Sequence, residues 1–268
     1  MRPAVLVIAA TYSSGGAGLT RDVRVLTDFS TDALCAITAV TAQSDSQVAA
    51  VHHVPPQIIR AQIAAALATR RADAIKIGML GTRATVEAVV ESLPADVSMP
   101  IVLDPVLVSS SGGVLLDADG RTAMRGKLFP RVMVITPNVP EAAALLDEDM
   151  ATNEQALIEQ AERLLAFGPR AVLIKGGHWD GEEAVDLLVC ADSLQRIVST
   201  RLQARSRGTG CALASAISAG LAHGVPLFEA CREAKRYVAE EMLGSGFLAR
   251  SPGEEGKMVI SNTTVMQR

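Results

Sequence analysis

The chain has 268 residues, of which 49% are hydrophobic, and a formal net charge of −4 at pH 7. This length and composition predict a sizeable core and a single domain over residues 1–268. The mildly acidic balance argues against nucleic acid or an anionic membrane as the main partner. No apolar run reaches the roughly eighteen residues of a membrane span. The cysteines form no C-x-x-C pair, a pattern typical of the reducing cytoplasm.

Apolar runs of strand length alternate with helical patterns along most of the chain. The predicted strands are residues 4–10, 34–41, 74–77, 101–103, 132–136 and 171–175. The predicted helices between them are residues 19–31, 57–69, 83–92, 141–146 and 154–167. Buried strands that alternate with helices form a mostly parallel sheet covered on both faces. We therefore predict an α/β fold of three layers.

The last third of the chain has a different pattern. Residues 184–189 and 194–202 are two adjacent strand-like runs, which predict an antiparallel hairpin at one edge of the sheet. Such an edge suits a lid or a dimer contact, and we expect a homodimer. Two more helices are predicted, one opening at Gly208 and one over residues 227–243. The tail from Gly244 onward is rich in Gly, Ser and Pro and predicts no clear element.

Polar and glycine residues cluster where the predicted parallel strands end. They are residues 13–16, Gln43, Gly78, 104–105, 136–138 and 175–177. In open α/β sheets, ligands bind beyond the carboxyl ends of the strands. We therefore predict that the functional site lies at this edge.

The segment Gly208-Thr209-Gly210-Cys211 opens a helix rich in small residues. The unpaired N–H groups and the dipole of a helix N-terminus favour an anion there. Taken alone, the segment fits a glycine turn before a tightly packed helix equally well. A helix start also lowers the pKa of a thiol, so we expect a lowered pKa for Cys211.

Asn138-Val139-Pro140-Glu141 follows a predicted strand and begins a helix. Taken alone, it predicts an Asn cap with a favourable Glu in the first turn. A functional interpretation puts Glu141 near a hydrated Mg²⁺, which usually keeps several waters and binds few carboxylates.

Asp104 and Lys175 each end a predicted strand. Asp104 is suited to hold a metal-bound phosphate or to cap a turn. Lys175 precedes Gly176-Gly177, which lets backbone and ammonium approach a phosphate together. A solvated strand-end lysine is the alternative.

Two other motifs are weaker. The segment 13–18 has neither the G-x-G-x-x-G spacing nor a Walker A lysine, so we interpret it as a substrate-side loop. His52-His53 is interpreted as a surface pair, because adjacent residues of a regular element seldom bind one metal.

Together these motifs resemble the ribokinase superfamily, and more closely the hydroxymethylpyrimidine/phosphomethylpyrimidine kinases of thiamin biosynthesis. The resemblance rests on residues 208–211, 138–141, 175–178, 76–80 and 104–106, and it runs in the family's order from about residue 4 to residue 243. The cysteine of the GTG-C motif is specific to this branch. The resemblance implies a ribokinase-like three-layer sandwich. It also implies that ATP and Mg²⁺ are used to phosphorylate 4-amino-5-hydroxymethyl-2-methylpyrimidine and then its monophosphate.

The resemblance also implies roles for individual residues. Cys211 stands where the base removes the proton of the attacking hydroxyl, and Gly208, Thr209 and Gly210 form the anion hole. Asn138 and Glu141 match the phosphate and magnesium motif, with Glu141 acting through water. Asp104 and Lys175 match positions beside the phosphates, and Lys235 matches one near the nucleotide. The pyrimidine positions are Asp22, Gln43, Met79 and Gly16.

Three departures from the family pattern bear on the substrate. Tyr12 replaces a carboxylate, Arg207 replaces a common His before the GTG-C motif, and residues 251–255 replace a Gly-His-Gly-rich segment. Our hypothesis is that Arg207 lowers the pKa of Cys211 and favours the monophosphate as substrate. One alternative is a pyridoxine or pyridoxal kinase. Another is a pyrimidine-binding protein without catalysis, for which Tyr12 is the best argument.

Overall fold

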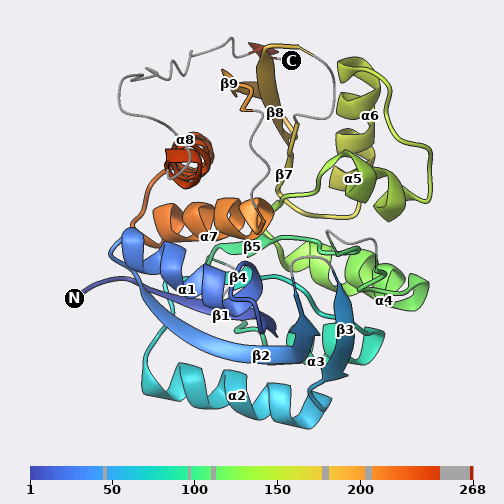
Figure 1. Cartoon of the computed structure of the whole chain (residues 1–268). Coiled ribbons are helices and arrows are strands. Elements are labelled where there is room, and N and C mark those ends of the chain that lie inside the picture. The colour runs from blue at the N-terminus through green and yellow to red at the C-terminus, as the bar shows by residue number, and fades with distance from the viewer. Residues whose placement is uncertain are drawn as a thin grey trace.

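The computed structural model describes residues 1–44, 47–95, 98–109, 113–176, 181–202, 207–247 and 266–267. Its centre is one sheet with the strand order β10-β9-β8-β7-β6-β5-β4-β1-β2-β3, seen in Figure 1. The strands from β7 to β2 in this order pair in parallel. They are β1 (Ala4–Tyr12), β2 (Asp32–Gln43), β4 (Ala74–Ile77), β5 (Ile101–Leu103), β6 (Val134–Ile135) and β7 (Ala171–Ile174).

Antiparallel strands extend the sheet on both sides. β3 (Val48–His53) pairs with β2 at one edge. At the other edge, β8 (Glu183–Cys190) and β9 (Ser193–Thr200) form the predicted hairpin against β7. The short strand β10 (Met266–Gln267) pairs with β9. The hairpin is therefore confirmed, but β10 covers part of its outer strand.

Helices cover both faces of the sheet, which confirms the predicted three-layer α/β fold (Figure 1). One face carries α1 (Gly18–Asp28), α7 (Thr209–Ala222) and α8 (Leu227–Phe247). The other carries α2 (Pro56–Thr69), α3 (Arg83–Ser92), α4 (Ala118–Ala123), α5 (Val139–Leu146) and α6 (Glu154–Leu165). A π-helical turn (Met124–Leu128) and a 3₁₀ turn (Phe129–Arg131) continue α4.

The sheet has a hydrophobic core on each face, because successive side chains of a strand point to opposite faces. In β1, Leu6 and Ile8 join the cluster under α2 and α3, whereas Val5 and Val7 join a cluster with Leu26 of α1. All four β1 side chains are fully buried. Strands buried on both faces lack polar alternation, and this is why β1 appears in the sequence as a continuous apolar run.

The sequence did not predict β3 or α4. Most of β3 is exposed, including His52 and His53, so it lacks the apolar run of a buried strand. The exposure of both histidines confirms the surface interpretation. α4 spans a few residues only and begins with the cap of Asp117, whose side chain accepts the Gly120 N–H at 2.8 Å.

No helix in the described part of the chain is long and apolar enough to cross a membrane.

A buried ion pair lies inside the layer between the sheet and α1. Lys76 of β4 donates to Asp22 Oδ2 of α1 at 2.8 Å, and both side chains are 0% exposed. Burial opposes both charges, and it raises the pKa of Asp22 against the influence of Lys76. At Lys76, Asp22 together with Cys211 and Asp104 outweighs burial and raises the pKa of the ammonium. The pair is ionic and depends on both partners, because an isolated charge in the core is very costly.

We predict that Lys76→Met lowers the free energy of unfolding by about 3–5 kcal/mol, because it leaves the Asp22 carboxylate buried and unpaired. Adding Asp22→Asn should restore most of this loss. Urea-induced unfolding measures both effects. The matched control is Lys127→Met, which breaks the exposed contact of Lys127 Nζ with Glu87 Oε1 at 2.7 Å and should change stability little. Wild-type stability in the single Lys76 variant would show that the pair carries no charge.

Candidate functional site

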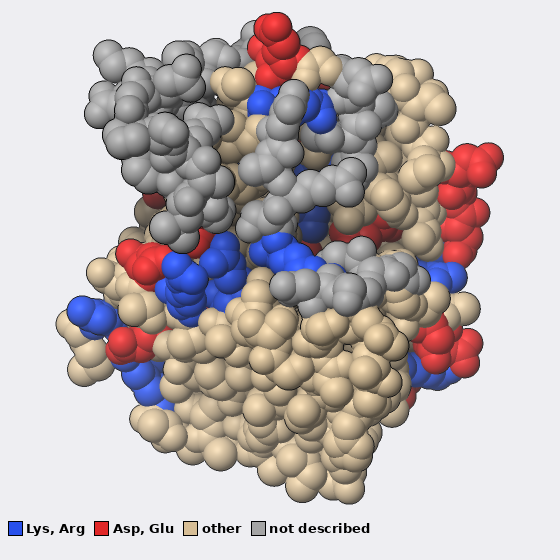
Figure 2. All heavy atoms as spheres, viewed as in Figure 1, with Lys and Arg blue, Asp and Glu red and all other residues tan. Residues whose placement is uncertain are grey.

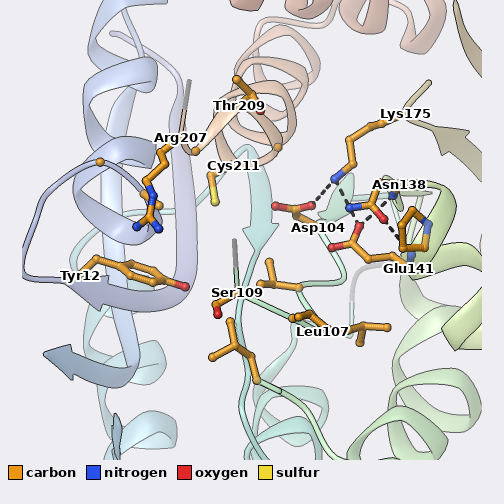
Figure 3. Close-up of a pocket in the computed structure, with 18 of the residues that line it drawn as sticks. Tyr12, Asp104, Leu107, Ser109, Asn138, Glu141, Lys175, Arg207, Thr209 and Cys211 are labelled. Carbon is orange, nitrogen blue, oxygen red and sulfur yellow. Dashed lines mark hydrogen bonds and ion pairs between the residues drawn. The ribbon is translucent and has the colours of Figure 1, made fainter. Parts of the chain in front are cut away.

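A cavity of about 1240 Å³ lies at the carboxyl ends of the parallel strands. Its wall contains most of the residues that the sequence predicts for the site: Gly16, Gln43, Asp104, Asn138, Glu141, Lys175, Gly208, Thr209, Gly210 and Cys211. Residues from six separate parts of the chain therefore meet in one place, as the strand ends predict. Figure 3 shows Asp104, Glu141 and Lys175 on one side, Tyr12 and Arg207 on the other, and Cys211 between them.

Lys175 is held between two carboxylates. Its Nζ donates to Asp104 Oδ1 at 2.9 Å and lies 3.5 Å from Glu141 Oε2. Burial opposes the charge on Lys175, but Asp104 and Glu141 outweigh it and raise its pKa. Burial also raises the pKa of Glu141, against the influence of Lys175. The result is a fixed ammonium at the cavity wall between the carboxylates of Asp104 and Glu141.

Asn138 and Glu141 form a complete capping box at the start of α5. Asn138 Oδ1 accepts the Glu141 N–H and Glu141 Oε2 accepts the Asn138 N–H, both at 2.8 Å. The sequence left a choice between a helix cap and a metal or phosphate motif. The cap is present, and it also holds the Glu141 carboxylate at the cavity wall next to Lys175.

The turn before α7 depends on two glycines. Gly208 has a φ of +71°, and a Cβ there would lie 2.3 Å from the carbonyl oxygen of Gly16. A Cβ on Gly210 would lie 3.1 Å from Lys175 Nζ. The absence of side chains thus brings the turn against the 13–18 loop and against the ammonium. The N–H groups at the start of α7 face the cavity beside a positive charge, an arrangement suited to phosphate.

The expected lowering of the Cys211 pKa is wrong. Burial raises the pKa of the Cys211 thiol to about 12, and the carboxylates of Asp104 and Asp22 add to the rise. Lys76 and the N–H of Gly18, which donates to the sulfur, oppose it without reversing it. The helix-start argument fails because desolvation of the thiolate outweighs the helix dipole. The part of the Arg207 hypothesis that requires a lowered pKa is wrong for the same reason.

The wall opposite Lys175 carries three polar groups. Gln43 is 6% exposed, and its Oε1 has no hydrogen-bond partner among the described residues. Tyr12 is 8% exposed, and its hydroxyl donates to Met79 Sδ at 3.5 Å. Arg207 lines the cavity and donates to the carbonyl oxygen of Ser44 at 3.0 Å. This wall has an acceptor, an aromatic ring and a cation.

Not every predicted residue reaches the cavity wall. Asp22 is fully buried beneath it, bound to Lys76. Met79 is 3% exposed and touches the site through Tyr12. Their predicted contact with a substrate stays a prediction. Gly177 and His178, which belong to the Lys175 motif, lie outside the described residues.

Lys235 lies on the far side of the glycine turn. It lines a second cavity of about 250 Å³, which shares Lys175, Thr209 and Gly210 with the first. Its Nζ is 2.9 Å from Asp186 Oδ1, the same oxygen that accepts the Gly176 N–H at 2.8 Å. Sequence reasoning missed Asp186, although a lone carboxylate inside the apolar run 184–189 was a usable signal.

Charged side chains are unevenly distributed on the surface shown in Figure 2. Lys and Arg gather in a band across the middle of this face, at the level of α7 in Figure 1. Below this band the centre of the face is tan, and the charged side chains lie toward its left and right margins.

Comparisons with known proteins agree with this arrangement. The family model described as phosphomethylpyrimidine kinase matches residues 13–250. The chain belongs to the phosphomethylpyrimidine kinase family. It is 40% identical over 239 residues to a hydroxymethylpyrimidine/phosphomethylpyrimidine kinase of Rhizobium meliloti, covering 89% of this chain and 90% of that protein. The corresponding Escherichia coli enzyme is 38% identical, with 88% and 90% covered.

Solved structures support the same assignment. A phosphomethylpyrimidine kinase from Clostridium difficile 630 superposes with a TM-score of 0.79 at 35% identity, over 90% of this chain and all of that one. A pyridoxal kinase from Staphylococcus aureus, solved with pyridoxal, gives a TM-score of 0.83 at 29% identity over 91% and 88%. The same pyridoxal kinase was also solved with AMP-PCP and pyridoxal. As a member of this kinase family, the chain is a phosphotransferase with a ribokinase-like fold.

We predict that Gly210→Ala lowers kinase turnover severalfold, because the added Cβ would lie 3.1 Å from Lys175 Nζ and would force this ammonium to shift. Steady-state kinetics and a thermal unfolding curve separate this effect from a loss of fold. The control is Gly126→Ala, where the added Cβ meets nothing within 4 Å. Equal turnover in the two variants would contradict the role given to this close approach.

Proposed function

We propose that the chain transfers the γ-phosphoryl group of ATP to the monophosphate of 4-amino-5-hydroxymethyl-2-methylpyrimidine, and that the free alcohol is the poorer acceptor. The observation that carries this proposal is the pair of cations on opposite walls of one cavity, Lys175 and Arg207, with a protonated thiol between them. Two cations suit a reaction with phosphate on both the donor and the acceptor. An oxygen of the acceptor phosphate attacks the γ-phosphorus, the bond to the β–γ bridging oxygen breaks, and ADP leaves.

On the donor side, Lys175 and the N–H groups at 208–210 stabilise charge on the transferred group. Lys235, paired with Asp186 in the second cavity, lies on the nucleotide side of the same turn. The wall of the cavity supplies few carboxylates, and no group of three or more potential metal ligands occurs among the described residues. Glu141 would hold a hydrated Mg²⁺, which keeps several waters and binds few carboxylates, and the ion would neutralise phosphate charge.

On the acceptor side, the buried Gln43 Oε1 lacks a partner among the described residues, and an amino group on the pyrimidine would satisfy it. The chain has Tyr12 where the family pattern has a carboxylate. Burial raises the pKa of Tyr12, so its hydroxyl is neutral at physiological pH. A neutral ring beside the cation Arg207 removes repulsion against an anionic acceptor.

The protonated thiol of Cys211 fits the monophosphate better than the alcohol. A pKa of about 12 leaves almost no thiolate at neutral pH. A hydroxyl must lose its proton during attack, whereas a phosphate oxygen is already ionised. Phosphoryl transfer through a loose transition state requires little proton abstraction in any case. We therefore assign Cys211 to donate a hydrogen bond to the acceptor phosphate rather than to act as an essential base.

The proposal predicts the outcome of a panel assay with ATP and Mg²⁺. The monophosphate should be phosphorylated with a higher kcat/KM than the free alcohol, and pyridoxal should be the poorest acceptor. Pyridoxal is included because pyridoxal kinases share this fold. A clear preference for the free alcohol or for pyridoxal would overturn the proposal.

Arg207 should carry much of this preference. We predict that Arg207→Gln lowers kcat/KM for the monophosphate roughly ten- to hundredfold, the typical effect of one hydrogen bond to a charged group. The value for the alcohol should change little. The charge-retaining control, Arg207→Lys, should keep part of the preference. An equal loss for both acceptors in Arg207→Gln would show that this arginine has no role in selecting the phosphate.

Cys211 variants separate the two roles of the thiol. We predict that Cys211→Ala lowers turnover of the monophosphate about 10²-fold, with nucleotide binding unchanged. Cys211→Ser should retain much more, because a hydroxyl still donates a hydrogen bond. Turnover by steady-state kinetics and ATP binding by calorimetry check this. Near-normal turnover in the alanine variant would contradict any role in the transfer.

A homodimer and a cytoplasmic location also stay proposals. The hairpin edge is partly covered by β10, whereas β3 forms the opposite edge of the sheet with an exposed face. If a second copy binds, β3 is the better candidate for the contact, and the molecular mass in solution tests this.

A further inference from the structure

Three side chains meet beneath the cavity without touching it. Asp22 Oδ1 accepts the Ser215 hydroxyl at 2.8 Å, and Asp22 Oδ2 accepts Lys76 Nζ at 2.8 Å. All three side chains belong to residues that are 0% exposed. They come from three elements, α1, α7 and β4. These hydrogen bonds therefore join α1 and α7 to strand β4 of the sheet.

Cys211 is joined to the same two helices one turn higher. The N–H of Gly18 donates to the Cys211 sulfur. Gly18 and Asp22 are four residues apart on α1, and Cys211 and Ser215 are four residues apart on α7. Residues at this spacing lie on the same face of a helix. Two successive cross-links therefore connect α1 to α7, one at the cavity and one in the core.

A glycine next to each cross-link allows a close approach of side chain and backbone. Gly18 has a φ of +63°, and a Cβ there would lie 2.2 Å from Cδ2 of Tyr12. A Cβ on Gly78 would lie 2.9 Å from Lys76 Nζ. Glycine at these two positions lets the Tyr12 ring and the Lys76 ammonium approach the backbone closely. A side chain at either position would therefore disturb the residues that form the cross-links.

We propose that Asp22, Lys76 and Ser215 are positioning residues for Cys211, which fix α7 against α1 one turn below the thiol and hold a charge pair beneath it. The proposal rests on the proposed function only in that Cys211 belongs to the transfer site. It gives Asp22 a role within the core in place of contact with the pyrimidine.

The charge pair acts on the thiol together with other groups that face it. The charged and titratable side chains that interact electrostatically with Cys211 are Lys76, Asp22, Asp104, Lys175 and Tyr12. After burial, Lys76 has the largest effect on the thiol, and it favours the thiolate. Asp22 disfavours the thiolate but holds the ammonium in place. Removal of both charges should therefore make the Cys211 thiol harder to ionise.

Alkylation of Cys211 by iodoacetamide tests this in the full chain without any substrate. Peptide mapping follows each cysteine separately between pH 8 and 10, where the wild-type rate at Cys211 should rise about tenfold per pH unit, because only the thiolate reacts. In Lys76→Met/Asp22→Asn the charges are gone, but the new amide still accepts the Ser215 hydroxyl. We expect Cys211 to react at least about threefold more slowly in this variant at each pH, which corresponds to a pKa rise of half a unit or more.

The sign of the change distinguishes positioning by charge from simple loosening. A loosened core exposes Cys211 and speeds its reaction, so an unchanged or faster rate overturns the proposal. Cys231 is 0% exposed and serves as the internal gauge, because its protection shows that the fold is intact. Since no phosphoryl transfer is measured, failure of the proposed acceptor preference leaves this test unaffected.

If Cys231 becomes reactive in the double variant, its fold has loosened, and a second pair of variants tests the proposal instead. Ser215→Ala removes only the hydroxyl bound to Asp22. Its matched control is Ser218→Ala, which removes an equally buried hydroxyl on α7 that bonds only to the carbonyl oxygen of Ala214 in the described structure. For the best acceptor in the panel assay, kcat should fall severalfold in Ser215→Ala, with KM for ATP unchanged, and stay at the wild-type value in Ser218→Ala. Equal kcat in the two variants would refute the proposal.

Discussion

The site depends on one ammonium group that joins three consecutive strand ends. Lys175 follows β7, Asp104 follows β5, and Glu141 lies on the helix that follows β6. In a parallel sheet the carboxyl ends of neighbouring strands lie side by side, so oppositely charged residues at those ends meet without any long loop. Asp104 is buried and the other two charges are largely buried, so each is stabilised by its opposite partner. The geometry that pairs them also directs the cluster toward the cavity.

Much of the fold was predictable because burial on both faces leaves a strong signal. Strands such as β1 and β7 are continuous apolar runs, and their ends are marked by glycine or polar residues. β3 was not predictable, because an exposed edge strand needs no apolar run. The site was predictable as a set of strand ends. The pKa of Cys211 and the position of Asp22 were not, because each depends on how deeply the tertiary structure buries a group that the sequence only places along a helix.

The two sides of the cavity differ in how closely their residues follow the family motifs. The side with Lys175, Asp104 and Glu141 has the groups that any transfer of a phosphoryl group needs, and it matches the family motifs. The side with Tyr12 and Arg207 departs from the family pattern, and it faces the acceptor in the proposed arrangement. Membership of the family therefore bears on the chemistry of the transfer, while the proposed choice of acceptor rests on Tyr12 and Arg207.

The contact between Gly208 and the carbonyl oxygen of Gly16 has a thermodynamic consequence. It joins the 13–18 loop on the acceptor side directly to the turn on the donor side, with no side chain between the two backbones. A ligand that pushes one backbone segment toward the other would displace it, because the two segments already lie close together. If either ligand does so, the acceptor and the nucleotide change each other's affinity by the same factor, since linkage between two sites is reciprocal. Two glycines in contact would thus be enough to make the binding of the two substrates cooperative.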